Sequence, residues 1–265
     1  MIASLAKFLV KIFSLLFKSS KHTFLYLLNK VMLAETDFYV DYEYSKTYPH
    51  IRKAINFIKK YKNFDGLILD IGAANATTPK KFASSLPNEL WAFEPLEQNK
   101  KYFEEINIKY PSIKFFPFAL GSDESMQKIN ITENITSSSL KQVNKDDISN
   151  DIFKTALRVN DEIEIEVKRM DDIVPSSKKV SLIKIDVQGF ELEVLKGGIN
   201  TLKNTDLVII EVSNHSSYKD SPRYFDIDKF MLEHNFTLFD MSLNVRENGH
   251  LLEWDAFYIN KSFRL

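Results

Sequence analysis

The sequence contains no cysteine, which excludes disulfide bonds, thiolate metal sites and a cysteine nucleophile. It has almost no net charge, with a formal value of -1, so we expect no nucleic-acid partner. Glycine is scarce, with seven in 265 residues, and the positions of those seven are therefore informative. The hydrophobic fraction of 44% argues against disorder, and the length fits one large α/β domain or two small ones.

Acidic residues are absent from residues 1–34, where five lysines interrupt a segment rich in Leu, Phe and Ile. Lys11 and Lys18 break every window of the ~20 apolar residues that a membrane-spanning helix needs, so we expect no span and no typical signal peptide. Residues 1–48 are predicted to form a basic amphipathic helical extension. It would either lie on an anionic membrane surface or pack on the domain or a second subunit.

Apolar runs alternate with helix-like segments over residues 49–265. We predict helices at 49–61, 80–86, 97–110, 191–202 and 226–235, and strands at 67–71, 89–95, 113–121, 180–189, 206–214, 236–241 and 255–263. This alternation predicts βαβ units in a mostly parallel, doubly wound sheet of Rossmann-like α/β class. Residues 121–180 interrupt it with a polar loop and two alternating runs at 128–132 and 162–170. We interpret them as an insertion that contains strands.

The first predicted strand leads into a turn of small residues, Asp70 to Ala76. Gly72 allows a tight turn, and Glu94 follows it by 22 residues at the end of the second predicted strand. An acid at that place accepts hydrogen bonds from ribose hydroxyls. The pattern fits either an ordinary βα turn or a site for a nucleoside cofactor. A missing second glycine disfavours NAD, and the order of elements alone does not choose between NAD and S-adenosylmethionine.

Five motifs in this order resemble the FkbM-type methyltransferases: LILDIGAANATT, LWAFEPLEQN, FFPFALGSDE, SLIKIDVQGFELEVLKGG and LVIIEVSNH. The resemblance covers about residues 66–260. It departs from the family at Gln188, where the family usually has Glu, at Ala74, where Asn is frequent, and at Ala76, where Gly is usual. It implies a class I methyltransferase fold, S-adenosylmethionine as cofactor, and a hydroxyl acceptor on a sugar, glycan or glycolipid.

The resemblance also implies roles for single residues. It places Asp70, Gly72 and Ala73 at the amino-acid end of the cofactor, and Glu94 with Pro95 at the ribose. Ala119 and Leu120 would lie beside the adenine, and Asp186 near the methyl group. The family often has a short Ser-Leu element in the insertion, matched here by Ser139-Leu140, which would form part of a lid.

An alcohol acceptor must lose its proton during methyl transfer, so a base or a metal ion is useful. Asp186, Glu211 and His215 follow or end predicted strands and are the catalytic candidates. Asp186 and Glu211 could instead hold a divalent cation, cap helices or pair with lysines. We expect an acid such as Glu191 to be the partner of Lys184.

Two other functions remain open. An NAD-dependent oxidoreductase would need a second glycine in the first turn and a convincing catalytic pair, which we do not find. A non-catalytic membrane-associated module with a degenerate cofactor pocket is compatible with Ala74, Ala76 and Gln188. The leading prediction is an O-methyltransferase with a carbohydrate acceptor, placed in the cytoplasm at the inner face of the membrane.

Overall fold

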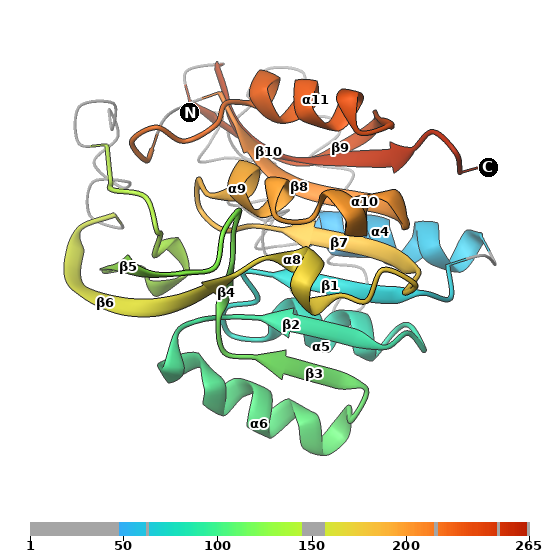
Figure 1. The fold of residues 1–265 in the computed structure, drawn as a ribbon, viewed down its shortest axis with the longest axis horizontal. Coiled ribbons are helices and arrows are strands. Elements are labelled where there is room, and N and C mark those ends of the chain that lie inside the picture. Colours follow the sequence, from blue (N-terminus) through green and yellow to red (C-terminus); the bar gives the residue numbers. More distant parts are fainter. Residues whose placement is uncertain (1–47, 62–63, 145–156, 215–216, 248–249, 264–265) are drawn as a thin grey trace, which may run out of the picture. The chain divides into compact units, whose positions relative to one another are not determined.

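The computed structural model describes residues 48–61, 64–144, 157–214, 217–247 and 250–263 (Figure 1). Residues 48–265 form one compact unit. The predicted extension lies outside the described residues except for Tyr48.

A seven-stranded sheet forms the centre of this unit. Its order is β3-β2-β1-β7-β8-β10-β9. The strands are β1 (Leu67–Ile71), β2 (Leu90–Phe93), β3 (Ile113–Phe116), β7 (Val180–Ile185), β8 (Thr205–Ser213), β9 (Phe236–Glu247) and β10 (His250–Asn260). The pairs from β3 to β8 are parallel, and β10 runs antiparallel to both of its neighbours. The predicted mostly parallel α/β sheet is confirmed.

Two apolar cores cover the two faces of the sheet, because side chains alternate along each strand. One face packs on α4 (Pro49–Lys60), α5 (Thr77–Ala83) and α6 (Lys100–Lys109), the last preceded by the short 3₁₀ helix η1 (Glu97–Asn99). The other packs on α8 (Met170–Ile173), α9 (Glu191–Lys196), α10 (Ile199–Lys203) and α11 (Tyr224–Glu233). Ile71, Ile183 and Ile210 point into one core, and Ile68, Leu182 and Ile209 into the other.

The predicted insertion forms a separate three-stranded sheet of order β4-β6-β5, with β4 (Ala119–Leu120), β5 (Ser125–Thr132) and β6 (Val159–Lys168). Its water-facing strands are confirmed, since seven of the ten residues of β6 are exposed. The prediction of one strand over 113–121 is wrong. The main-sheet strand ends at Phe116, and Ala119 and Leu120 pair with β6 instead.

The predicted helix at 191–202 is also two helices, α9 and α10. Gly197 and Gly198 lie between them, and a Cβ atom at Gly197 would collide with the carbonyl oxygen of Gly121. This close approach of two loops separates the helices. The helix predicted at 80–86 begins earlier, at Thr77.

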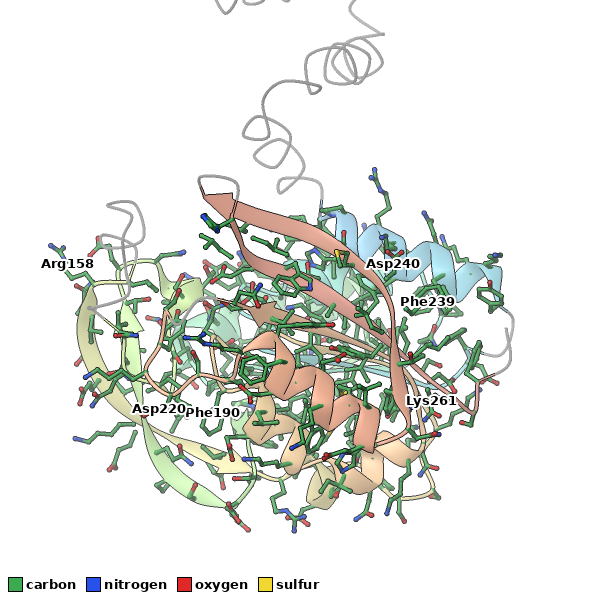
Figure 2. All side chains as sticks on the ribbon, turned by 90° about the horizontal axis from the view of Figure 1, so that it is seen from above. Arg158, Phe190, Asp220, Phe239, Asp240 and Lys261 are labelled. Atoms are coloured by element: carbon green, nitrogen blue, oxygen red, sulfur yellow. The ribbon has the colours of Figure 1, made fainter. Side chains whose placement is uncertain are left out.

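The sheet edge at β9 is longer than predicted and packs beside α4. The ring of Phe239 lies 5.0 Å from that of Phe57, and Asp240 pairs with Lys53 at 2.7 Å. Figure 2 labels both β9 residues beside this helix. These two contacts hold the middle of α4 against β9.

Candidate functional site

The turn after β1 is shaped by a close approach to the loop after β7. Gly72 has φ of +81°, and a Cβ atom there would overlap the carbonyl oxygen of Asp186. Ala74 and Ala76, at φ of 44° and 60°, also adopt left-handed conformations that favour glycine or asparagine. The two departures from the FkbM pattern in this turn therefore keep the backbone shape at a cost in strain.

Glu94, at the end of β2, is held by the backbone of this turn. Its carboxylate accepts hydrogen bonds from the backbone N–H groups of Ala74 and Leu96, each at 2.9 Å. The side chain is buried, and burial raises the pKa of Glu94, opposed by those backbone donors. Each carboxylate oxygen keeps a free lone pair after one such bond. The group can therefore still accept hydrogen bonds from a ligand diol.

A cavity opens beside Glu94, beyond the carboxyl ends of β1, β2 and β7. Its lining combines apolar side chains with a few polar groups, namely Ile71, Gly72, Ala74, Phe93, Glu94, Pro95, Leu96, Asn99, Ala119, Leu120, Ile129, Ile135, Thr136, Ser138, Ser139, Leu140, Ile165, Asp186, Val187, Gln188 and Phe190. The apolar walls suit the base of a nucleoside, and the buried carboxylate of Glu94 suits the diol of its ribose. The residues present thus fit the adenosine part of S-adenosylmethionine.

The cavity brings together six of the eight predicted cofactor residues: Gly72, Glu94, Pro95, Ala119, Leu120 and Asp186. Asp70 and Ala73 do not line it and are buried below the turn. Asp70 faces Lys184 at 3.8 Å, and neither of its oxygens has a hydrogen-bond partner among the described residues. Asp70 thus lies beside Lys184 at the end of β1, outside the lining of the cavity.

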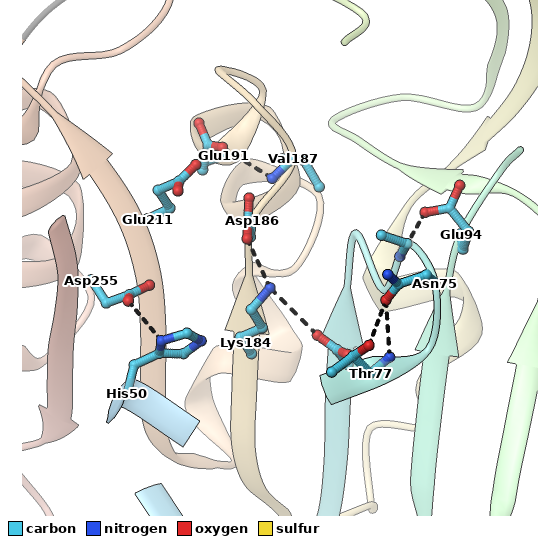
Figure 3. A network of polar contacts seen from close by, with 12 residues as sticks. His50, Asn75, Thr77, Glu94, Lys184, Asp186, Val187, Glu191, Glu211 and Asp255 are labelled. Atoms are coloured by element: carbon cyan, nitrogen blue, oxygen red, sulfur yellow. Dashed lines mark hydrogen bonds and ion pairs between the residues drawn. The ribbon is translucent and has the colours of Figure 1, made fainter. Parts of the chain in front are cut away.

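On the other side of the cavity, side chains contact one another across β1, β7 and β8 (Figure 3). Lys184 Nζ lies 3.0 Å from Asp186 Oδ2. The amide nitrogen of Gln188 donates to Asp186 and to Glu211, at 2.8 Å each. Glu191, the expected partner of Lys184, instead accepts hydrogen bonds from the backbone N–H groups of its own loop. The expected burial of Lys184 with an acid is confirmed, but Glu191 is not that acid, because the parallel register sets Lys184 directly beside Asp70 and its own strand brings Asp186 to it.

The contacts around Asp186 and Glu211 shift the pKa values of these two acids in opposite directions. Burial alone would raise the pKa of Asp186, but Lys184 and Gln188 outweigh it and lower the pKa. Burial and the nearby charge of Asp186 raise the pKa of Glu211 well above its usual range. Burial would lower the pKa of Lys184, and its carboxylate neighbours Asp186 and Asp70 raise it instead. The surroundings therefore favour the ionised form of Asp186 and the protonated form of Glu211.

A second, smaller pocket lies on the far side of Gln188 from the first. Its lining is Gln188, Gly189, Glu191, Glu211, Val212, Ser213, Ser217, Tyr218, Ser221, Pro222, Ile227 and Glu253. Gln188 and its neighbour Glu211 thus stand between the two spaces. Carboxylates and hydroxyls of this kind accept hydrogen bonds from a polyhydroxylated ligand.

Three further site residues escaped the sequence analysis: His50, Tyr218 and Asp255. His50 Nδ1 lies 3.2 Å from Asp255 Oδ2, and both side chains are buried below Lys184 (Figure 3). Burial lowers the pKa of His50 to about 4, so its imidazole is neutral at neutral pH. Strand alternation could have identified Asp255, which pairs in register with Glu211. His50 gave no signal, because it lies in the first turn of an ordinary amphipathic helix.

The remaining predicted residues have separate outcomes. His215 lies outside the described residues. Ser139 and Leu140 line the cavity, and Ser139 Oγ donates to the backbone carbonyl of Gln188 at 2.6 Å.

Over the described ranges, no three His, Cys, Asp or Glu side chains group as metal ligands. The N–H donors of Gln188 also point between Asp186 and Glu211, an arrangement that does not fit a cation bound between them.

The strand order, the cavity at the strand ends and the acid after β2 define a Rossmann-like protein of the class I methyltransferase type. A sequence model of the methyltransferase FkbM domain matches residues 70–238. The chain belongs to the FkbM methyltransferase family, as the motifs predicted.

Individual relatives are distant. The chain is 25% identical over 193 residues to the 2-O-methyltransferase NoeI of Sinorhizobium fredii, covering 64% of this chain and 75% of the relative. Among solved structures it is similar to the FkbM methyltransferase of Methylobacillus flagellatus KT, with 14% identity and a TM-score of 0.48, over 74% of this chain and 44% of that one. This chain thus spans less than half of that protein. The magnesium protoporphyrin IX methyltransferase of Synechocystis PCC 6803 gives 8% identity and a TM-score of 0.46, over 85% and 86% of the two chains.

The expected lack of a spanning helix concerned residues 1–34, which lie outside the part of the chain that the structure describes. Within the described part, no helix is both long and apolar enough to cross a bilayer.

Proposed function

We propose that this protein is an S-adenosylmethionine-dependent O-methyltransferase that modifies a hydroxyl of a sugar, glycan or glycolipid. The observation that carries the proposal is the cavity that joins Glu94, an acceptor for a diol, to the carboxylate of Asp186. Membership of the FkbM family supports methyl transfer over NAD-dependent oxidation. The distant relative NoeI, a 2-O-methyltransferase, supports an oxygen acceptor.

The cofactor supplies an electrophilic methyl group when bound, and the chain positions the reacting groups. Glu94 holds the ribose diol, and the loop after β7 places Asp186 beside the reacting end of the cavity. The acceptor hydroxyl enters from the second pocket, where carboxylates and serines accept hydrogen bonds from neighbouring hydroxyls. Holding acceptor oxygen and methyl carbon about 3 Å apart provides most of the rate.

The acceptor proton needs a destination as the new O–CH₃ bond forms and the S–CH₃ bond breaks. We assign Glu211 as the proton acceptor, because its raised pKa makes its carboxylate more basic than that of Asp186. Asp186, kept ionised by Lys184, accepts a hydrogen bond from the acceptor and orients it. The methyl-transfer rate is then expected to rise with pH as Glu211 loses its proton.

Calorimetry with S-adenosylhomocysteine tests the cofactor assignment. Glu94→Ala should weaken binding by about 1–3 kcal/mol, because charge-assisted hydrogen bonds to the ribose are lost. Glu97→Ala, a change to an exposed acid of η1, serves as the matched control and should leave the affinity unchanged. Equal affinities for the Glu94 variant and the wild type would remove Glu94 from the site.

Transfer of a labelled methyl group to a panel of neutral sugars and glycolipids tests the reaction itself. Asp186→Asn should lower turnover by ~100-fold while the affinity for S-adenosylhomocysteine stays close to normal. Full turnover in this variant would reject the orienting role of Asp186 and leave Glu211 or His215 to act on the acceptor without it. Full activity of the wild type in excess chelator would dismiss a role for a divalent cation.

We further propose that residues 1–34 contact anionic membranes from the cytoplasmic side, where lipid-linked acceptors are found. Each lysine near such a surface contributes about 1 kcal/mol, an attraction that salt weakens. Flotation of the full chain and of residues 35–265 with anionic and neutral liposomes tests this. Equal flotation of the two proteins would reject the membrane contact, and a changed oligomeric state on truncation would favour packing on a subunit.

A further inference from the structure

Gln188 has more connections than its neighbours in the loop after β7. Its side-chain nitrogen contacts both Asp186 and Glu211, and its side-chain oxygen lies 3.0 Å from the hydroxyl of Tyr218. Its backbone carbonyl accepts the hydrogen bond from Ser139, a residue of the cavity wall. Its backbone has φ of 56°, a conformation that costs a non-glycine residue energy and persists only where surrounding contacts enforce it.

The orientation of the amide follows from its neighbours. The ionised carboxylate of Asp186 can only accept hydrogen bonds, so the nitrogen of Gln188 must face it, and the same nitrogen lies 2.8 Å from Glu211. The amide oxygen then faces the hydroxyl of Tyr218, which also lies 2.7 Å from the backbone carbonyl of Ser137. The residue therefore connects two strand ends with the segment that covers the cavity.

The two carboxylates need such a donor between them. Asp186 and Glu211 follow or end neighbouring strands of the sheet, and each contacts the same amide nitrogen at 2.8 Å. Lys184 reaches Asp186 from below, and the acids Glu191, Glu253 and Asp255 add like charge from α9 and β10. Pairs of close carboxylates ordinarily share a proton or bind a cation.

We propose that Gln188 is a positioning residue whose two N–H groups hold Asp186 and Glu211 side by side in place of a shared proton or a cation. This inference rests on the proposed function, because it concerns the carboxylates assigned there to the acceptor hydroxyl. With both carboxylates held by neutral donors, Glu211 remains free to take a proton during the reaction. The link through Ser139 couples this arrangement to the cavity wall.

The experiment first adds a carboxylate at position 188 and then exchanges the amide of Gln188 with the carboxylate of Glu211. Gln188→Glu replaces both donors with a third carboxylate of nearly the same shape. The double variant Gln188→Glu/Glu211→Gln restores one amide and one carboxylate in exchanged positions. Gln142→Glu adds the same charge at an exposed glutamine and is the matched control.

Thermal unfolding of the full chain at pH 8 and pH 6 gives the first readout. Gln188→Glu should unfold about 4 °C or more below the wild type at pH 8. The deficit should shrink at pH 6, because the folded variant takes up a proton that bridges its carboxylates. The double variant should recover at least half of the deficit at pH 8, and Gln142→Glu should follow the wild type at both pH values.

Added Mg²⁺ or Mn²⁺ gives the second readout, since the variant's new carboxylate completes a group of three acids. Either ion should raise the unfolding temperature of Gln188→Glu at pH 8 and leave that of Gln142→Glu unchanged. A Gln188→Glu protein with the same pH and metal response as Gln142→Glu would overturn the inference. So would a double variant no more stable than the single one, including failure of both to fold.

Binding of S-adenosylhomocysteine to the same proteins separates this inference from the proposed function. If the wild type does not bind it, the proposed cofactor is wrong, while the stability comparison still tests the role of Gln188. If all variants bind it normally and behave alike in unfolding, only the role of Gln188 is rejected.

Discussion

The two halves of the site are built in different ways. In the cofactor half, the carboxylate of Glu94 binds backbone N–H groups only two and 20 residues away in sequence. In the half that we propose binds the acceptor, side chains bind side chains. Gln188, in the loop after β7, binds Glu211 of β8, and Lys184 of β7 faces Asp70 of β1. Backbone donors are present whatever the sequence, whereas side-chain partners must be specified individually. The first half therefore tolerates substitutions that the second should not.

Lys184→Met should have the largest effect, because it leaves the buried carboxylate of Asp70 and the partly buried carboxylate of Asp186 without their cation. Removing one partner of a buried pair costs about 3–5 kcal/mol. Burial, opposed by Lys184, already raises the pKa of Asp70 to about 6, and without Lys184 this pKa rises further. A carboxylate with a raised folded-state pKa favours folding as pH falls, so the deficit should be greatest near pH 8 and decrease toward pH 4.

Chemical denaturation across that pH range measures this deficit. Lys196→Met is the control, because Lys196 forms an exposed pair with Glu193. Such surface pairs contribute at most about 1 kcal/mol. Similar losses for the two lysine variants would mean that the acceptor half does not depend on its buried cation.

Gly72→Ala should come next, with a loss of about 3 kcal/mol in unfolding free energy. The methyl group would meet the carbonyl oxygen of Asp186, and φ of +81° adds strain for any residue with a side chain. Because the collision joins the two halves, affinity for S-adenosylhomocysteine should fall as well. A variant of unchanged stability and affinity would show that the halves are mechanically independent.

Ala74→Gly should have the smallest effect, and of opposite sign. Glycine relieves the left-handed strain at φ of 44° but gains freedom in the unfolded chain, so we expect a net stabilisation of about 0.5 kcal/mol. The same substitution at Ala83, in α5, should destabilise by about 0.5 kcal/mol, because a helical site offers no strain to relieve. Differential scanning calorimetry measures the change in stability of both variants. If both substitutions destabilise the protein, the argument from backbone strain at Ala74 is rejected.

Much of the fold could be predicted from local patterns. Alternation of apolar runs and helical segments gave the parallel sheet, and polar alternation gave the exposed strands of the insertion. The errors fell where contacts between distant segments determine the outcome. Ala119 and Leu120 leave the main sheet because β6 offers them a partner, and α9 ends at Gly197 because the loop at Gly121 approaches it.

By itself, the sequence determined the turn at Gly72, the acid Glu94 after the second strand and the family of the chain, because each depends on residues close in sequence or on a contiguous motif. The tertiary structure alone decided that Lys184 pairs with Asp70 and Asp186, that His50 meets Asp255, and that Gln188 joins two carboxylates. Strand register sets the pairing of Lys184 with Asp70, and register depends on the packing of the whole sheet. The contacts of His50 and Gln188 depend instead on how α4 and the loop after β7 pack on that sheet.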